Sequence, residues 1–379
     1  MTDVALRMLF GDRAKYAMLV SGICCSTLLM TQGLAMFFGI LSFSYATATN
    51  IRAPIWVIDP MVQQVGDNQP LRDTDVDRVR SVEGVAWAAP LFVGNAQVRL
   101  IGGGATQPVT LVGLDSGTFA GAPVHLVAGT IQDLHQAQGV VVDSQFLRLL
   151  KSWRGQTLAL GDAFEMNDRR AVIVGIAEVA QGMGGASYVF TTWDRAKEFA
   201  PSQRRMLTHI LAAPVPGRTV AEVASAISAG TGLKAVSEVQ FKDMSEHWMI
   251  ANSPIPFVVG LIVAVGFLVG VAVSGQTFYT FILENSRHLG ALKAMGTSNA
   301  TLAGMILTQA TLVGGVGFGI GVGLVSAFFA SLPAGRVPLL LLWPVPVLVL
   351  AAVLLICGVA AIAGVWRVAR IEPAIVFRS

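Results

Sequence analysis

The chain has 379 residues, of which 54% are hydrophobic and 13% charged, and its mean hydropathy is +0.64. Soluble globular domains carry about 25% charged residues, so this composition excludes an ordinary soluble protein and indicates one that hides apolar surface in lipid. The net charge of +3 is small, and Lys and Arg are not gathered into a stripe with interleaved aromatic residues, so no nucleic-acid partner is expected.

Four apolar runs without Asp, Glu, Lys, Arg or His predict membrane-spanning helices. Each is longer than the roughly 20 residues that cross a hydrocarbon core of about 30 Å. Small residues after the first run imitate a signal-peptidase site, but the run is about twice as long as the apolar part of a signal peptide, so a retained span is favoured. The spans are placed at residues 16–45, 254–281, 300–332 and 339–365.

Positive charges beside the spans predict the orientation. Arg and Lys precede the first span, lie between the second and third, and follow the fourth, whereas the connection between the third and fourth holds only Arg336. Both termini and the middle loop are therefore expected in the cytoplasm, with residues 46–253 in the periplasm. The other segments are an interfacial helix at 1–15 with Leu6, Leu9 and Phe10 on one face, a coupling helix and turn at 282–299, an outer loop at 333–338 and a cytoplasmic tail at 366–379.

The segment between the first two spans is predicted to be an α+β domain, because about 200 residues can bury their own core and its short β-rich runs alternate with helical patterns. Antiparallel pairing is expected. Tyr45–Asn50 and Phe241–Trp248 are expected to continue the first and second spans outward as a stalk. The predicted strands are 55–58, 96–101, 108–112, 139–142, 171–176 and 188–191, and the predicted helices follow Thr74 and begin at Arg218.

The fold class is thus a membrane α-helical protein with four transmembrane helices, both ends in the cytoplasm, and a large α+β extracytoplasmic domain inserted between helices 1 and 2. No catalytic, metal or cofactor site is predicted, because the sequence lacks GxxxxGK[ST], HExxH, GxSxG and CxxC motifs. Ion-coupled transporters place ionisable groups within the bilayer, and these spans have none. Energy for transport is therefore expected from another subunit.

Glycines recur at four-residue spacing in two of the predicted spans. This spacing lets helices approach closely, and it is compatible with packing inside one chain or with a homodimer seam. The residues are Gly266 and Gly270 in the second span and Gly315, Gly319 and Gly323 in the third.

The cytoplasmic run LENSRHLGALKAMGTSNATL, from Leu283 to Leu302, predicts two helices joined by a tight corner. Gly296 suits the position that ends a helix, and Thr297 or Ser298 can cap the next one. Such a corner suits docking into a groove on a cytoplasmic partner, and an inert amphipathic linker at the membrane surface is the alternative. Its apolar ridge consists of Leu289, Leu292 and Met295.

At these residues the chain resembles the permeases of MacB- and FtsX-type ABC transporters, and among them the stand-alone permeases of DevC type. The family motif after the second span is matched by Arg287 and by Leu292 to Gly296, with His288 at the family's acidic position. The stretches Asp73–Pro90, Leu111–Asp115 and Arg367–Arg378 are similar to the opening of the family's outer domain, its following strand and its closing segment.

The resemblance implies a homodimeric permease of the inner membrane that binds two copies of a separate ABC ATPase, which would bind the ATP. Nucleotide-driven closure would bend the stalks and reshape the outer domains, a process called mechanotransmission. A periplasmic membrane-fusion adaptor and an outer-membrane channel would complete an efflux system embedded in membrane lipid. The residues expected to contact the ATPase are Glu284, Arg287, His288, Leu289, Leu292, Lys293 and Met295.

A second hypothesis is an FtsX-like switch that transports nothing and activates an extracytoplasmic enzyme. The size of the outer segment favours export, because the outer domains of FtsX proteins tend to be smaller.

Overall fold

The computed structural model describes residues 2–11, 13–101, 106–148, 158–200, 207–332 and 339–369. The chain forms two compact units. The membrane unit comprises Met1–Gly39, Pro254–Pro333 and Leu339–Ser379, and the outer unit comprises Ile40–Ser253 and Ala334–Pro338.

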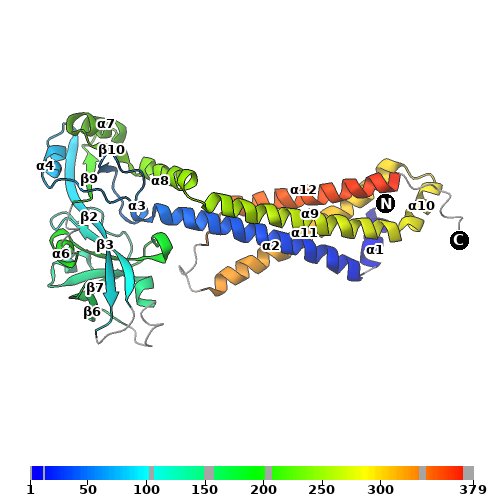
Figure 1. Cartoon of the computed structure of the whole chain (residues 1–379), viewed down its shortest axis with the longest axis horizontal. Helices are drawn as coiled ribbons and strands as arrows, with labels where there is room; N and C mark the ends of the chain where they lie inside the picture. The colour runs from blue at the N-terminus through cyan, green and yellow to red at the C-terminus, as the bar shows by residue number, and fades with distance from the viewer. Residues whose placement is uncertain are drawn as a thin grey trace. The chain divides into compact units, whose positions relative to one another are not determined.

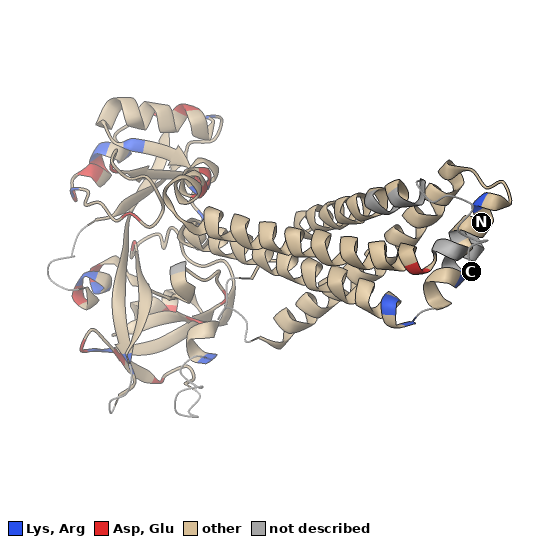
Figure 2. Cartoon of the chain, turned by 45° about the vertical axis from the view of Figure 1, so that its right-hand side comes forward, with Lys and Arg blue, Asp and Glu red and all other residues tan. Residues whose placement is uncertain are grey.

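Long apolar helices make up the membrane unit (Figure 1). Within the described residues, four helices are long and apolar enough to cross a membrane, namely α2, α9, α11 and α12. Their ribbons carry charge only near the ends that adjoin α1 and α10 (Figure 2). The bounds are α1 Thr2–Gly11, α2 Arg13–Ser44, α9 Ile255–Glu284, α10 Ser286–Ala294, α11 Asn299–Ser331 and α12 Pro344–Ala369.

Two details of the membrane unit differ from the sequence-based expectations. The fourth span begins at Pro344 and not at residue 339, because proline suits the first turn of a helix and disfavours helical backbone in the residue before it. Leu9 and Phe10 do not share a face: Leu9 is 1% exposed in the bundle core, whereas Phe10 is 49% exposed. Consecutive helical residues point about 100° apart, so both cannot face the same surface.

The core of the membrane unit is formed by aliphatic and aromatic side chains from all four long helices. Lipid offers no hydrophobic driving force between helices, so close packing of these side chains holds the bundle together. Representative members are Leu19, Ile23 and Met30 of α2, Phe278 and Ile282 of α9, Ile306 and Val313 of α11, and Val349 and Val353 of α12.

The outer unit is built around a sheet whose strands, in the described part of the chain, run in the order β10-β1-β9-β2-β3-β8-β5-β7-β4, with β6 beside β2 and β7 (Figure 1). The strands are β1 Ile55–Ile58, β2 Val85–Arg99, β3 Gln107–Leu114, β4 Leu126–Gly129, β5 Gly139–Asp143, β6 Ala163–Met166, β7 Arg169–Ala177, β8 Ser187–Thr192, β9 His209–Pro214 and β10 Lys234–Ser237. The helices are α3 Ala46–Asn50, α4 Asp75–Arg80, α6 Trp193–Phe199, α7 Val220–Thr231 and α8 Glu238–Asn252, with 3₁₀ segments η1 Ile131–His135 and η2 Met183–Gly185.

Five of the six predicted strand runs lie within strands, and the run 96–101 extends past the end of β2 at Arg99. The sheet is mixed and not purely antiparallel. β3 pairs with β8, and β5 with β7, in parallel. Sequence reasoning missed β4, β6, β9 and β10. β9 reads HILAAP and β10 has four residues, so neither shows the alternation of β-branched side chains that marks a strand.

Aromatic side chains fill the centre of the outer unit's main core. Trp56 of β1 is fully buried, and it packs against Phe241 of α8 and His209 of β9 at ring-centroid distances of 5.4 and 5.5 Å. Burial lowers the pKa of His209 to about 4, so its ring is neutral near pH 7. Phe241 therefore fastens α8 to the sheet through apolar contact.

Gly129 marks a close backbone approach that no other residue type fits. Its φ is +77°, and a Cβ placed there would overlap the carbonyl oxygen of Val174 and lie 2.8 Å from the Cα of Gly175. Gly217 has a similar φ of +95° but nothing within 4 Å of such a Cβ among the described atoms. Substitutions at Gly129 and Gly217 therefore distinguish the cost of steric overlap from the cost of backbone strain alone.

We expect Gly129→Ala to lower the free energy of unfolding of the outer unit by about 3 kcal/mol or more, and Gly217→Ala by about 1 kcal/mol. Chemical denaturation of the purified full chain measures both. Equal losses in the two variants would contradict the packing of β4 against β7.

Candidate coupling elbow and anchored stalk helices

The predicted corner between the second and third spans is a short elbow that begins at Asn285. The backbone nitrogen and the side-chain Nδ2 of Asn285 both donate to the carbonyl of Phe281, at 3.1 and 2.9 Å. These bonds close the last turn of α9 and let α10 start in a new direction.

The elbow ends at Gly296, as the sequence predicted. Gly296 has a φ of +92°; its nitrogen donates to Lys293 O, and Thr297 N donates to Leu292 O, both at 3.1 Å. This pair of bonds is a Schellman motif, which requires left-handed backbone and so favours glycine. Ser298 then caps α11, because its Oγ accepts from Thr301 N at 3.2 Å.

The predicted ATPase contacts differ in exposure. His288 is exposed and Met295 is 74% exposed, whereas Leu292 is half-buried and packs against the bundle core. Glu284 forms an ion pair with Lys15 of α2. Lys293 is half-buried, and the side chains of Arg287 and Leu289 lie outside the described residues.

The glycines of the second span pack inside the chain. A Cβ on Gly266 would lie 3.2 Å from Leu29 Cβ and Met30 Cγ, and one on Gly270 would lie 2.7 Å from Ser26 Oγ. α9 and α2 therefore approach closely at these two positions, and an alanine would force them apart.

The glycines of the third span fall into two sets. At Gly315, Gly319 and Gly323 a Cβ would meet no described atom within 4 Å, so these residues form an open stripe. The close approach of α11 to α2 uses two other glycines with the same four-residue spacing, Gly317 and Gly321, so the spacing alone did not distinguish the packed face from the open one. A Cβ on Gly317 would lie 2.8 Å from Ile23 Cγ2, and one on Gly321 would lie 2.7 Å from Thr27 Cβ.

The helix α3, which follows the first span, is fastened to the outer unit by polar contacts. Thr47 Oγ1 and Tyr188 OH lie 2.8 Å apart. Asn50 donates from Nδ2 to the carbonyl of Ala180 at 2.6 Å and accepts from Ala180 N at 2.8 Å. A two-way carboxamide bond of this kind fixes both position and orientation.

The helix α8, which precedes the second span, is fastened in a similar way. Ser245 is fully buried, and its Oγ accepts from Val65 N at 2.8 Å. Trp248 Nε1 donates to Gln63 Oε1 at 3.0 Å. Together with the buried Phe241, these contacts tie α8 to the loop after β1. The expected stalk segments are helical, but they do not continue the spans: α2 ends at Ser44 before α3, and α8 ends at Asn252 before α9 begins at Ile255. The sequence gave no signal for the partners of these side chains, which are distant in the chain.

A buried carboxyl lies beside the Tyr188 anchor. Asp143 ends β5, is fully buried, and accepts from Gln145 N at 3.0 Å, but its Oδ2 has no hydrogen-bond partner among the described residues. Burial raises the pKa of Asp143 to about 6. Burial also raises the pKa of Tyr188 to about 12, so its hydroxyl stays protonated for the contact with Thr47.

Comparison with known proteins agrees with this architecture. The family described as MacB-like periplasmic core domain matches residues 20–229, and the FtsX-like permease C-terminal family matches residues 260–373. Two uncharacterized ABC transporter permeases, from two strains of Mycobacterium tuberculosis, are each 24% identical to this chain over 321 residues, covering 81% of it and 79% of their own length.

Solved structures with similarity include the extracellular domain of the noncanonic ABC-type transporter YknZ from Gram-positive bacteria, at 13% identity and a TM-score of 0.35, covering 49% of this chain and 98% of that one. The periplasmic region of MacB from Actinobacillus actinomycetemcomitans has 14% identity and a TM-score of 0.38, covering 52% of this chain and 94% of that one.

The apolar helices and the matched families define a multi-pass permease of the bacterial inner membrane with a MacB-like periplasmic α+β domain. The chain belongs to the MacB/FtsX family of ABC transporter permeases, as the resemblance predicted. Members of this family work with an ATPase partner, and permeases of this type are typically not catalytic themselves.

The raised pKa of Asp143 makes stability depend on pH. Between its ordinary value of 3.8 and its folded value of about 6, the folded state binds more protons than the unfolded state, so stability falls as pH rises through this window. We expect Asp143→Asn to stabilise the outer unit near pH 7 by about 1 to 3 kcal/mol, because it removes the buried charge. The gain should vanish near pH 4, where the wild-type carboxyl is protonated.

Thermal unfolding of wild type and Asp143→Asn at pH 7 and pH 4 measures the difference in stability. His209 is present in both proteins, so its own titration cancels in the difference. A gain that is independent of pH would contradict the buried charge at Asp143.

Proposed function

We propose that this chain is the permease subunit of an ATP-driven ABC export system that works by mechanotransmission from a separate cytoplasmic ATPase to the periplasmic domain. One observation carries the proposal. α3 and α8 are the chain segments nearest to the first and second spans, and both are anchored in the outer unit through buried or part-buried hydrogen bonds. A displacement of either span would therefore be passed to the sheet.

The proposed orientation has both termini and the elbow in the cytoplasm, with the outer unit inserted between the first and second spans in the periplasm. It is supported by the Lys and Arg residues that flank the inner ends of the spans. The absence of nucleotide-binding motifs and of ionisable groups in the middle of the spans supports an external source of energy.

The elbow is the proposed docking site for the ATPase. Its exposed side chains, His288 and Met295, are available to a partner, and Leu292 packs the elbow against the bundle. The Lys15–Glu284 ion pair joins α2 to the end of α9, just before the elbow. A force applied to the elbow would then be transferred directly to α2 and α9. Arg287, Leu289 and Lys293 complete the proposed contact set.

The proposed assembly is a homodimer with two ATPase copies, and the ATPase subunits bind the nucleotide. The open stripe of Gly315, Gly319 and Gly323 is the proposed seam, since small residues at four-residue spacing let two helices in lipid approach closely. A periplasmic membrane-fusion adaptor and an outer-membrane channel would carry the cargo onward.

We expect Met295→Asp to weaken assembly with the partner ABC ATPase by about tenfold or more, because a charge replaces an apolar contact in the docking surface. Met61→Asp is the matched control: Met61 is 78% exposed in the outer unit, so the same substitution there should leave assembly unchanged.

Co-purification and the coupled rate of ATP hydrolysis measure the effect. Met295 suits this test better than Leu292, whose packing against the bundle would be disturbed by a charge. Wild-type assembly and hydrolysis in Met295→Asp would remove Met295 from the interface. The same result when Met295→Asp is combined with His288→Ala would contradict docking at the elbow.

A further inference from the structure

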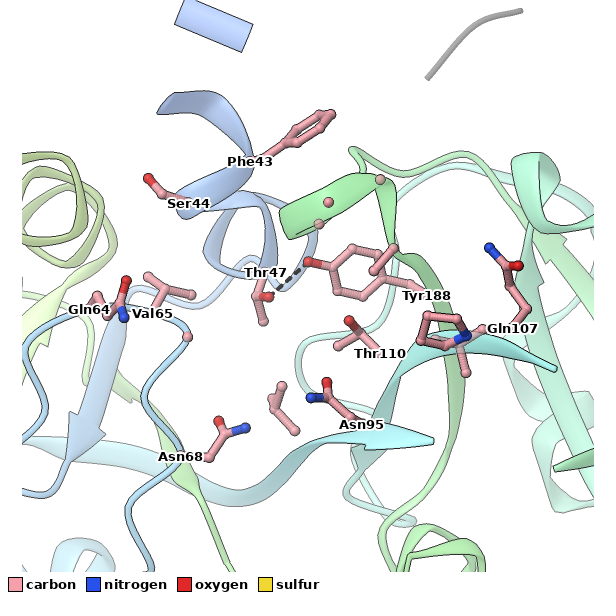
Figure 3. A pocket seen from close by; sticks show the side chains of 18 of the residues that line it. Phe43, Ser44, Thr47, Gln64, Val65, Asn68, Asn95, Gln107, Thr110 and Tyr188 are labelled. Carbon is pink, nitrogen blue, oxygen red and sulfur yellow. Dashed lines mark hydrogen bonds between the residues drawn. The ribbon is translucent and has the colours of Figure 1, made fainter. Parts of the chain in front are cut away.

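The outer unit contains a cavity of about 600 Å³ that the proposed function leaves unused (Figure 3). This volume is in the range of small-molecule sites in proteins. Its walls come from the outer end of α2, from α3, from the loop after β1, from the β2–β3 hairpin and from the segment before β8. Every residue that lines it belongs to the outer unit.

One wall of the cavity is a face of the β2–β3 hairpin whose polarity changes along its length. Val93 stands opposite Val112, and both side chains are buried in the main core. Two residues further on the same face, Asn95 stands opposite Thr110, and Asn95 is exposed. This face is apolar where it packs in the core and polar where it lines the cavity, which is the pattern of a binding surface.

The lining is polar but, among the described residues, it includes no Lys, Arg, Asp, Glu or His. A charged ligand would find no counter-ion to compensate for its lost hydration, so the cavity selects against charge. A carboxamide offers the same donor and acceptor as a peptide bond. Carboxamides are the commonest polar groups in the lining: Gln64, Asn68, Asn95, Gln97 and Gln107.

The carboxamides surround the space from several elements. Figure 3 shows Asn68 and Asn95 turned towards each other, with Gln64 on the side of α3 and Gln107 on the far strand. Gln64 Nε2 donates to Asp67 Oδ1 at 3.2 Å, which leaves Gln64 Oε1 as an acceptor for a ligand N–H.

We propose that this cavity binds a short uncharged peptide segment, whose main-chain amides pair with the carboxamides of Gln64, Asn68 and Asn95. A sugar fits less well, because the aromatic rings in the described lining are those of Phe43 and Tyr188. Tyr188 is 1% exposed and its hydroxyl is taken by Thr47, so it offers little face for a sugar ring to stack on.

The cavity also connects the anchors of both stalk helices. Thr47 of α3 lines one side, and Val65, whose nitrogen is held by Ser245 of α8, lines another. A ligand that touches both walls binds more tightly to one relative placement of α3 and α8 than to another. Ligand binding and the ATPase cycle are then reciprocally linked. This linkage rests on the proposed function, whereas the binding itself does not.

The test uses the detergent-purified full chain and a pool of N-acetylated, C-amidated tripeptides made of Ala, Ser and Gln. At millimolar concentration the pool should raise the unfolding temperature by a few degrees. Gln97→Glu and Asn95→Asp, which place a charge in the cavity, should each abolish the shift. Gln132→Glu makes the same change on the exposed surface away from the cavity and should retain it.

The assignment would be overturned by no shift with wild type, by an equal shift in the two cavity variants, or by an equal shift with pools that carry Lys or Glu. A shift with the trisaccharide of N-acetylglucosamine in place of the peptides would also overturn it.

Adding the pool to the permease–ATPase complex tests the linkage separately. Binding without a change in ATP hydrolysis would overturn the linkage alone, and failure of the complex to assemble would count against the proposed function but not against the cavity.

Discussion

The structure depends on a constraint set by lipid: a helix within the hydrocarbon core satisfies its own backbone and carries a charge only at high cost. The four long helices obey it throughout their middle parts, with Lys15 and Glu284 paired near the ends of α2 and α9. In the described part of the spans, no acidic or basic side chain lies in the middle of these helices. Under the proposed function, the work of the outer unit arrives through the ends of the spans.

Under the proposed function, the two ends of the spans take part in this transfer in different ways. At the elbow, backbone bonds at Asn285 and Gly296 fix the turn, and Leu292 packs into the bundle. In the outer unit, Thr47, Asn50 and Ser245 attach α3 and α8 to the sheet and to the loop after β1. Under the proposed function, the elbow receives force and these side chains deliver it. The cavity beside them is the place where a ligand would sense the movement.

Local chemistry decided which parts of this arrangement could be predicted from sequence. Gly296 was predicted because a helix stop needs only nearby backbone, and the spans were predicted because their length and lack of charge follow from lipid alone. The start of the fourth span was placed too early because the apolar run begins before Pro344, the residue at which α12 begins. The packing glycines Gly317 and Gly321 were missed because which face of α11 meets α2 is a tertiary property.

The cavity and the anchors were beyond the reach of sequence reasoning for the same reason. Asn95 and Asn68 come from separate elements, and a lone carboxamide in a loop or strand carries no periodic signal. β9 lies between β1 and β2 in the sheet although it is far from both in the sequence. Its low β-propensity hides it, so the order of the strands could not be predicted from the sequence either. The cavity and the anchors are therefore formed mostly by contacts between residues that are distant in the sequence.

Under the proposed function, the elbow and the outer unit lie on opposite sides of the membrane. Single cysteines at Met61→Cys and Met295→Cys, in a chain whose Cys24, Cys25 and Cys357 are replaced by alanine, test it with a membrane-impermeant maleimide on spheroplasts. Both methionines are more than 70% exposed, so both positions are open to reagent. We expect labelling at 61 in intact spheroplasts and at 295 only after permeabilisation. Labelling at 295, with protection at 61, would contradict it.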